Sequence, residues 1–500
     1  MSNVETVEDP EDPRLTDYRE IRDAERRRRS GTFIAEGRQV VRRLLDVGRY
    51  RARSALVTPP ALDALGGALA DARVPTYLVR QDIVNAIVGI EFHHGCLAVG
   101  ERGAEQTPEA VHGAREMAGK GVPAGSLTID WPELMRFKRA LVDPTPARTE
   151  QTWAKMGIEQ FHGRARFVGP TTLAVGDDRL TGRRILIAAG AIPAPLKFPG
   201  AERLTTSEQF LNLDGLPASL AFVGGGYISF EFAHVAARAG ARVTILHRGA
   251  RPLEGFDPDL VDLLVKRSRQ LGITVELGVD VLGVDPAGDR LVVRGMQGGQ
   301  ARRFEVDLAV HGAGRVPEID DLDLAVAGVQ RERRGVIVNE FLQSVSNPAV
   351  YAGGDAAASG PPLTPKATHD AEVLTTNLLE GNRRTPKYDG IASACFTLPP
   401  IASAGLTEEA ARAGGRRFRT SRQDTSGWFN TLRVGGTVSG FKVLIEEDTG
   451  RILGAHLLGP HAEEVINVFS LAIRLGIPAD ELKQALFAYP TYSWDTRFML

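Results

Sequence analysis

Hydrophobic positions near the start of the chain alternate between strand-like and helix-like spacing. The apolar runs predict short strands at 33–37, 54–58, 75–79 and 95–102, and helices at 61–72 and 81–89. Another helix has its apolar face at Val40, Val41, Leu44 and Leu45. Charges spaced four residues apart predict a further helix over 19–29. Because strands and helices alternate, we expect a small α/β domain over residues 10–103.

The next pattern is a stretch rich in glycine, alanine and proline, residues 103–125, which is typical of a linker. Further on, an apolar strand, Leu220–Val223, leads into three glycines and then into a helix that carries an acid, Glu231. A second strand follows at Ala241–Leu246. A strand, a glycine turn, a helix and a strand in this order predict a nucleotide-binding unit of the Rossmann type.

The end of the chain has its own periodicity. Residues 441–459 alternate apolar and polar positions, which predicts strands with one buried face. An apolar helix is predicted directly after them, over 463–476. We therefore expect a C-terminal domain in which strands are followed by a helix.

Composition places the chain among globular proteins. Its 500 residues suggest roughly three domains, and 43% of them are apolar. The formal net charge of −2 gives no general attraction for nucleic acid or membranes, but Arg14 to Arg53 holds 13 arginines against six acids. This run is either a solvated helix face or an RNA contact.

The cysteine count and the N-terminal residues narrow the classes of protein further. The first residues are acidic and interrupted by proline, and no apolar run long enough for a membrane span follows, so we expect a cytoplasmic protein. The two cysteines, Cys96 and Cys395, have neither zinc nor disulfide spacing. We expect no metal at His93, His94 and Cys96. The cluster of His461, Glu463 and Glu464 is interpreted as structural.

The glycine turn predicts a dinucleotide site. Gly224, Gly225 and Gly226 bring bare backbone amides to a helix N-terminus, where a pyrophosphate can approach. Ser229 stands at the third glycine position of the GxGxxG pattern, where a small residue is tolerated. No second turn of this kind occurs in the chain.

The end of the strand after this turn indicates which cofactor is bound. An NAD site places an acid there for the ribose hydroxyl, whereas this chain has His247, Arg248 and Arg251. Cations favour a 2′-phosphate, so we predict NADPH. The alternative is that these arginines are merely solvated at the end of a strand.

Two stretches of the first domain, FIAEGRQVV and GCLAVGER, resemble the N-terminal RNA-substrate-binding domain of TrmH/SpoU-type RNA 2′-O-ribose methyltransferases. The resemblance implies RNA as a partner of residues 10–103. That family's S-adenosylmethionine-binding domain has no counterpart after Gly103, so methyltransferase activity is not expected.

The chain from Trp131 onward resembles the pyridine nucleotide-disulfide oxidoreductases, the family of glutathione, lipoamide and mercuric reductases. The motifs ILIAAGAIP, FVGGGYISFEFA, HGAGRVPE, NPAVYAGGDAA, LTPKA and GRILGAHLLGPHAEEVIN occur in the family's order. The resemblance implies a linker and remnant of an FAD-binding domain at 104–210, an NAD(P)-binding Rossmann domain at 211–325, the remainder of the FAD domain at 326–387 and a dimerisation domain at 388–500. A homodimer is expected from the last of these.

The resemblance also assigns residues to two cofactors. It implies that Glu231 lies near the nicotinamide and that Gly314 and Arg315 border the NADPH site. Flavin contacts are implied around Gly190 and at the turn that contains Gly354 and Asp355, with LTPKA under the flavin ring.

The chain departs from this family in three features. The family's first strand, GxGxxG turn and helix for FAD are missing, as is its CxxxxC pair, and YPTYSW places Tyr489 and Trp494 where the thiol proton relay has His and Glu. We therefore expect an NADPH-binding family member, truncated at its N-terminus and fused to the RNA-methyltransferase-like domain, with impaired FAD binding and no assigned catalytic residue. The alternative is a non-catalytic RNA- or nucleotide-binding fusion product.

Overall fold

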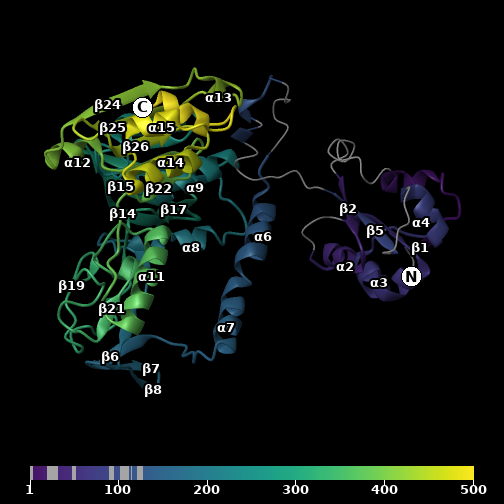
Figure 1. Ribbon diagram of the computed structural model, residues 1–500, viewed down its shortest axis with the longest axis horizontal. Coiled ribbons are helices and arrows are strands. Elements are labelled where there is room, and N and C mark those ends of the chain that lie inside the picture. Colours follow the sequence, from purple (N-terminus) through teal and green to yellow (C-terminus); the bar gives the residue numbers. More distant parts are fainter. Residues whose placement is uncertain are drawn as a thin grey trace. The chain divides into compact units, whose positions relative to one another are not determined.

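The computed structural model describes residues 4–19, 32–47, 52–88, 95–101, 112–113, 115–120 and 128–500. It divides into two compact units, Met1–Ala110 and Val111–Leu500 (Figure 1). We describe each unit by itself. Most of the predicted helix over 19–29, together with His93 and His94, lies outside the described residues. The finer domain boundaries expected within the second unit stay predictions.

The first unit is built on one mixed sheet in the order β1-β4-β3-β5-β2. Its strands are β1 (Val4–Thr6), β2 (Thr32–Glu36), β3 (Ala52–Val57), β4 (Thr76–Leu78) and β5 (Cys96–Glu101). Its helices are η1 (Pro13–Tyr18), α2 (Arg38–Val47), α3 (Pro59–Ala72) and α4 (Gln81–Val88). Strands β1, β4 and β3 are parallel, whereas β5 is antiparallel to both β3 and β2.

Alternate residues of the central strands supply two cores. Leu56 and Leu97 pack in one cluster with residues of η1 and α4, whereas Ala55 and Cys96 pack in another with residues of α2 and α3. The strands predicted at 33–37, 54–58, 75–79 and 95–102 and the helices predicted around 40–45 and at 61–72 and 81–89 are confirmed. Strand β1 was not expected within the acidic start of the chain. Val40 is 54% exposed although it was assigned to the apolar face, because the stripe of α2 that packs on the core is formed by Val41, Leu44 and Leu45.

The second unit contains a four-stranded parallel sheet in the order β13-β12-β11-β17, which confirms the predicted Rossmann-type unit. The sheet comprises β11 (Ser219–Val223), β12 (Arg242–His247), β13 (Thr274–Leu277) and β17 (Leu308–His311). Helices α9 (Tyr227–Arg238) and α10 (Pro258–Gln270) accompany it, and β14 (Val279–Ala287), β15 (Arg290–Gln297) and β16 (Gln300–Val306) form an antiparallel meander. Phe222, Phe230 and Leu264 belong to its core.

Next to this sheet lies a smaller and less complete part. Its two-stranded parallel sheet pairs β9 (Ile185–Ile187) with β21 (Val350–Ala352), and the ribbon of β10 (Ala191–Pro193) and β18 (Arg315–Pro317) connects it to the Rossmann-type part. The remaining strands are β6 (Ala165–Gly169), β7 (Thr172–Val175), β8 (Asp178–Thr181), β19 (Arg331–Glu332) and β20 (Gly335–Val336). The helices are α6 (Trp131–Val142), α7 (Thr145–Lys155), η2 (Ala201–Arg203), α8 (Ser207–Phe210), η3 (Gly354–Ala356) and α11 (Thr364–Glu380).

The C-terminal part is an antiparallel sheet in the order β22-β23-β26-β25-β24. Its strands are β22 (Ala392–Cys395), β23 (Ile401–Gly405), β24 (Phe418–Asp424), β25 (Gly440–Glu446) and β26 (Ile452–Leu458). Its helices are α12 (Glu408–Ala413), α13 (Phe429–Leu432), α14 (Ala462–Leu475), α15 (Ala479–Gln484) and η4 (Ser493–Phe498).

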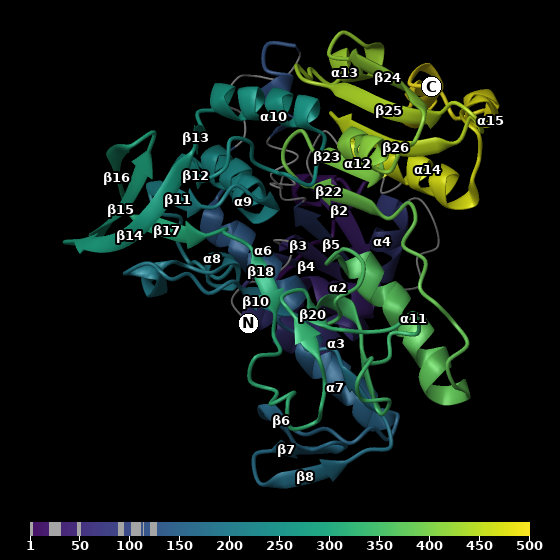
Figure 2. The ribbon, with the colours of Figure 1, turned by 90° about the vertical axis from the view of Figure 1, so that its left-hand side faces the viewer.

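Strands β25 and β26 differ from the expectation of one buried face, because both of their faces are buried. Helix α14 covers one face, where Val443 and Ala455 pack with Phe469. Helix α10 of the Rossmann-type part lies against the other face, where Leu260 shares a cluster with Leu458 (Figure 2). In the described part of the chain, no helix is long and apolar enough to cross a membrane.

Candidate nicotinamide and flavin site

The predicted glycine turn connects β11 to α9. Gly224 has a φ of 113°, and its amide donates to the carbonyl of Leu246 at 2.8 Å. A Cβ at Gly224 would collide with the carbonyl oxygen of Gly312, so only glycine fits there. Gly226 is the residue before the helix, and no side chain caps its first amides. The N-terminus of α9 is therefore free to receive a phosphate group.

Ser229 and Gly225 explain how the turn is supported. Ser229 is buried, and its hydroxyl lies so close to Gly312 that a Cβ on that glycine would not fit. A small residue at position 229 therefore lets α9 approach the end of β17. On the other side, a Cβ at Gly225 would lie 2.7 Å from the imidazole ring of His247.

The end of β12 places its three predicted cofactor residues in different surroundings. His247 is buried against the turn, and its Nε2 donates to the carbonyl of Arg251 at 2.8 Å. His247 thus supports the turn from behind Gly225. Arg248 is exposed, whereas Arg251 has a buried Nε without a hydrogen-bond partner. An anionic oxygen would satisfy that donor.

Sequence reasoning missed an acid beside these cations. The carboxylate of Glu254 lies 3.9 Å from Nε2 of His247 and is largely exposed. A negative charge at this place opposes a 2′-phosphate. The preference for NADPH therefore depends on the balance between Glu254 and the two arginines.

Glu231 lies on the second turn of α9, partly buried. Its Oε1 accepts a hydrogen bond from the amide of Phe396 at 2.9 Å, and burial raises its pKa. The fully buried Cys395 is the last residue of β22, and its thiol contacts the carbonyl of Tyr227 at 3.9 Å. Burial, and then the charge of Glu231, raise the pKa of the Cys395 thiol well above its usual value. This thiol is held neutral and is not a nucleophile.

Three of the residues predicted near the NADPH and flavin sites, Gly190, Gly314 and Arg315, belong to the β10–β18 ribbon or directly precede its strands. Gly190 precedes β10, and its carbonyl accepts from the amide of Glu318 at 3.0 Å. Gly314 precedes β18, and its carbonyl accepts from the amide of Ala194 at 3.0 Å. The guanidinium of Arg315 donates to the carbonyl of Ala191. Gly314 and Gly190 therefore lie at opposite ends of the ribbon, and the side chain of Arg315 reaches across it to the strand that follows Gly190.

The turn after β21 contains Gly354 and Asp355 and rests on a buried ion pair. Lys366, from the LTPKA motif, donates to the carbonyl of Gly354 at 2.8 Å and lies 2.7 Å from the carboxylate of Asp370. Asp370 in turn accepts from the amide of Gly354 at 3.0 Å and from the hydroxyl of Tyr388 at 2.7 Å. Lys366 and Asp370 are both buried.

Tyr227 links the glycine turn to the flavin-side residues. It is the first residue of α9 and is half exposed. Burial raises the pKa of its phenol, and the charges of Arg315, Asp355 and Glu231 all act on it. Arg315, Asp355 and Glu231 therefore all lie near Tyr227. Tyr227 was missed because an aromatic residue after a glycine turn has no distinctive signal in the sequence.

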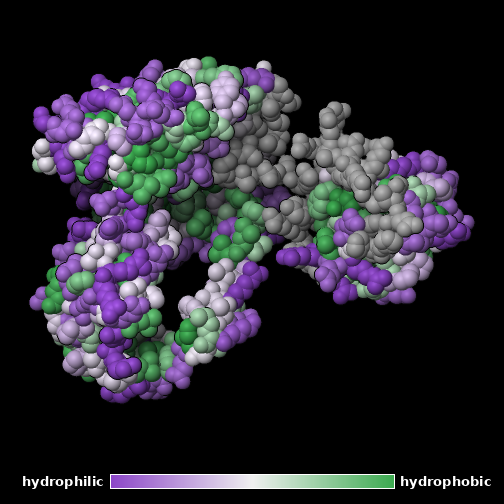
Figure 3. All heavy atoms as spheres, in the orientation of Figure 1, coloured by the Kyte–Doolittle hydropathy of each residue, from purple (hydrophilic) through white to green (hydrophobic). Residues whose placement is uncertain are grey.

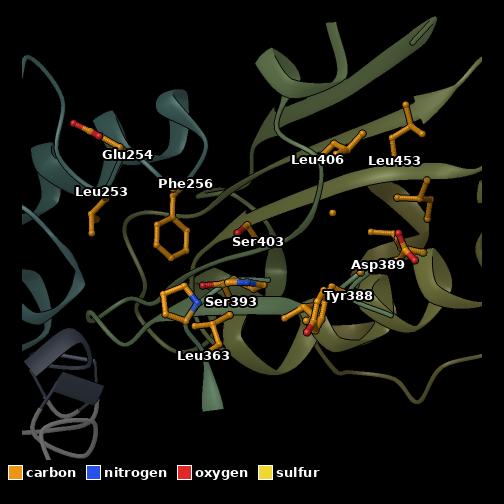
Figure 4. Close-up of a pocket in the computed structure, with 18 of the residues that line it drawn as sticks. Leu253, Glu254, Phe256, Leu363, Tyr388, Asp389, Ser393, Ser403, Leu406 and Leu453 are labelled. Atoms are coloured by element: carbon orange, nitrogen blue, oxygen red, sulfur yellow. The ribbon is translucent and has the colours of Figure 1, made fainter. Parts of the chain in front are cut away.

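A groove of about 870 Å³ begins at this point. Its walls come from the loop after β12, the segment before α11, the start of β22 and the end of β23. In Figure 4, Leu253, Glu254 and Phe256 stand on one side and Leu406 and Leu453 on the other, with Ser393, Ser403 and Tyr388 between them. The groove is mostly apolar with a few hydroxyl and charged groups, as expected of a ligand site.

The remaining candidate residues show no further reactive site in the described part of the chain. Cys96 is a free, buried cysteine, and burial raises its pKa to about 11. No cluster that could hold a metal occurs among the described residues. His461 precedes α14, and its ring lies near that of Tyr492, with 4.9 Å between ring centroids. Tyr489 and Trp494 form an aromatic pair, with their ring centroids 5.5 Å apart.

In the comparison with known proteins, two family models match this chain. The family model described as pyridine nucleotide-disulphide oxidoreductase matches residues 78–371, and the model of its dimerisation domain matches residues 391–497. The first match begins inside the first structural unit.

Three relatives illustrate the range of similarity. The glutathione reductase of Burkholderia cepacia is 31% identical over 76% of this chain and 84% of its own length. An uncharacterized 19.7 kDa protein in the mercuric resistance operon of Staphylococcus aureus is 49% identical over its whole length and 36% of this chain. Among solved structures, a similar one is that of the HOCl-induced flavoprotein disulfide reductase RclA from Escherichia coli, as the copper(II) complex of a mutant. Its TM-score is 0.69 at 25% sequence identity, and the match covers 90% of this chain and 98% of the RclA chain. This chain therefore belongs to the pyridine nucleotide-disulphide oxidoreductases, a family whose cofactors are FAD and NAD(P)H.

Proposed function

We propose that the second unit binds NADPH at the glycine turn and acts as an oxidoreductase whose electron acceptor differs from a protein disulfide. The observation that carries the proposal is the uncapped N-terminus of α9 directly after a turn in which only glycine fits at position 224. Amides and a guanidinium are the donors that the phosphates of a dinucleotide require. NADPH, when bound, supplies a hydride from its nicotinamide ring.

Each residue of the site has a distinct task in this proposal. The amides of Gly225 and Gly226 hold the pyrophosphate, and Gly224, whose own amide bonds to the carbonyl of Leu246, shapes the turn. Arg248 and Arg251 hold the 2′-phosphate. Glu231 orients the nicotinamide end, where its bond to the amide of Phe396 fixes the carboxylate. No catalytic residue is assigned.

FAD binding is expected to be weak in this chain alone. Gly190, Gly354 and Asp355 would contact the flavin and ribityl end, but the family's first dinucleotide turn is missing from the 500 residues. Losing several charge-assisted hydrogen bonds of about 1.5–3 kcal/mol each lowers affinity by several orders of magnitude. Disulfide reductase turnover is not expected, because the chain carries no CxxxxC pair.

Calorimetry with NADPH and NADH tests the cofactor assignment. The unmodified chain should bind NADPH more tightly, and Arg248→Glu should reverse the order, because one contact to phosphate is worth about 10- to 150-fold in affinity. Arg179→Glu, an exposed arginine on β8, is the matched control and should change nothing. Equal affinities for the two cofactors that Arg248→Glu leaves unchanged would overturn the assignment.

A homodimer formed by the C-terminal part belongs to the same proposal. The dimerisation-domain match and the exposed apolar residues of α14, Leu471 and Leu475, support it. A cytoplasmic location stays a prediction.

RNA binding by the first unit is a second candidate function, and the non-catalytic alternative rests on it. One observation favours it: α2 exposes Arg38, Arg42 and Arg43, within the segment that resembles the TrmH/SpoU-type substrate-binding domain. Binding to a transfer RNA should weaken as salt rises, and Arg38→Glu with Arg43→Glu should lower the slope of that dependence by about two. A salt slope unchanged in the double variant would count against this role.

A further inference from the structure

Helix α7 lacks the packing that a helix of its length needs. It has 11 residues and buries none of them. In water, isolated helices shorter than about 12–15 residues are marginal, and most helices in proteins owe their stability to a packed face. Helix α6 is packed near its start, through Trp131 and Met135. The arm formed by α6 and α7 is therefore incomplete as it stands.

Apolar side chains are exposed along this arm and just beyond it. They are Leu141, Val142, Trp153, Met156, Ile158 and Phe161. Met156 is 69% exposed and Leu141 is 55% exposed. Figure 3 shows apolar residues on the arm beside an opening that separates it from the rest of the unit. Contiguous exposed apolar surface on a helix usually marks a binding face.

The strand β9 has a second incomplete feature. Its partner β21 is covered on its far side, since the amide of Ala352 donates to the carbonyl of Leu342 and the amide of Ser344 to that of Val350. No strand of the described residues pairs with the outer edge of β9, where Leu186 is 41% exposed. Parallel sheets occur almost only inside a layer of helices on both faces, so a pair of parallel strands with an open edge is unusual.

We propose that the arm and the open edge of β9 are the docking surface for a separate α/β protein. That protein adds parallel strands beside β9, packs a helix against α6 and α7, and carries the dinucleotide-binding turn for FAD that these 500 residues lack. The inference rests on the proposal that this chain alone binds FAD weakly. Parallel strands are connected through helical crossovers, so only an α/β unit can both extend the sheet and cover the arm.

Two other occupants fit the surface less well. Among the described residues of the first unit, Val40 is the only large apolar side chain that is exposed. A second copy of the chain would bring another two-stranded sheet that is itself incomplete. The Staphylococcus aureus relative corresponds to 36% of this chain along its whole length, so one part of this fold is known as a chain of its own.

Hydrogen exchange of the purified full-length chain tests whether the first unit, a second copy or neither of them covers the arm. The amides of α7 should exchange quickly at low and at high protein concentration, because no described residue of the second unit buries this helix. Protection at both concentrations would mean that the first unit covers the arm. Protection only at high concentration would mean that a second copy does. Either result would overturn the proposal.

Capture in the native host identifies the partner. The tagged full-length chain, crosslinked and analysed by mass spectrometry, should retain a protein that contains a strand, a GxGxxG turn and a helix, and the complex should contain FAD. Trp153→Glu should reduce its recovery by about 30-fold, the effect of losing one central apolar contact. Leu282→Glu, an exposed apolar residue of β14 away from the arm, is the matched control.

These experiments test the docking surface independently of the NADPH site. Trp153→Glu should leave the affinity for NADPH unchanged, because Trp153 does not line the groove. Recovery of no protein with a dinucleotide turn, or equal recovery with Trp153→Glu and Leu282→Glu, would refute the docking surface even if NADPH binds as proposed.

Discussion

At the scale of single residues, the shape of the cofactor turn depends on which atoms lie behind each glycine. Gly225 is backed by the ring of His247, whereas Gly224 is backed by the main chain at Gly312. The sequence pattern predicted that these glycines are needed for phosphate approach. It could not predict that His247 fills the space behind them, because that contact is set by how β12 packs beside β11.

Gly225→Ala should weaken NADPH binding. The added Cβ would lie 2.7 Å from the His247 ring, so either the ring or the turn must move. We expect at least about a tenfold loss of affinity, since even one charge-assisted bond to the phosphates is worth more than that. Calorimetry measures the loss. Gly215→Ala, which has open space around its Cβ, should bind NADPH normally, and normal binding by both variants would contradict the geometry.

Because of His234, the free energy of unfolding should decrease at acidic pH. Its Nδ1 accepts from the amide of Leu398 at 3.1 Å, its Nε2 pairs with Ser268 at 2.9 Å, and burial, with Arg238 beside it, holds its pKa well below the usual value. Below a pH of about 6.5 the unfolded chain takes up this proton and the folded chain does not. The free energy of unfolding should therefore fall with decreasing pH by up to about 1.4 kcal/mol per pH unit for this residue.

Urea unfolding at neutral and mildly acidic pH measures this effect. His234→Gln can keep both hydrogen bonds but cannot take up a proton, so it should lose less stability on acidification than the unmodified chain. Equal losses would show that His234 does not titrate in this way.

At the scale of elements, one lysine connects the Rossmann-type part to the C-terminal sheet. Lys442 of β25 lies 2.8 Å from the carboxylate of Asp257 and 2.6 Å from that of Asp259, at the start of α10. Asp257 also caps α10 by accepting from the amides of Asp259 and Leu260. Both Lys442 and Asp257 are buried.

Lys442→Met should destabilise the chain by about 3–5 kcal/mol, because it leaves the carboxylate of Asp257 buried without a counterion. Arg422→Met removes an exposed partner of the same Asp259 and should cost less than about 1 kcal/mol. Chemical denaturation compares the two variants. A loss for Lys442→Met as small as that for Arg422→Met would mean that water reaches Asp257.

The sequence predicted those elements whose pattern is local. Strand β11, the glycine turn and α9 are contiguous, and their apolar positions face one sheet, so periodicity sufficed. Strand β1 was missed because only pairing with β4, far away in sequence, makes it a strand. The burial of both faces of β25 and β26 also escaped prediction, since α10 covers the second face from another part of the chain.

At the scale of the whole molecule, association should depend on α14. Leu471 and Leu475 are more than half exposed although they are apolar. We expect a homodimer in light scattering, and Leu475→Glu should shift it toward monomer by placing a charge on the buried interface. Leu282→Glu is the control and should stay dimeric. A monomeric unmodified chain at micromolar concentration would contradict the expectation.

The ion pair beneath the turn after β21 has a consequence for the evolution of this chain. Replacing either Lys366 or Asp370 alone would leave the other as a buried charge without its partner. Replacing both would lose their hydrogen bonds to Gly354 and Tyr388 but would leave no unpaired charge. The two positions should therefore change together in related sequences. Relatives with a lysine at the first position should carry an acid at the second, and relatives with an aliphatic residue at the first should seldom keep the acid unless they supply another cation.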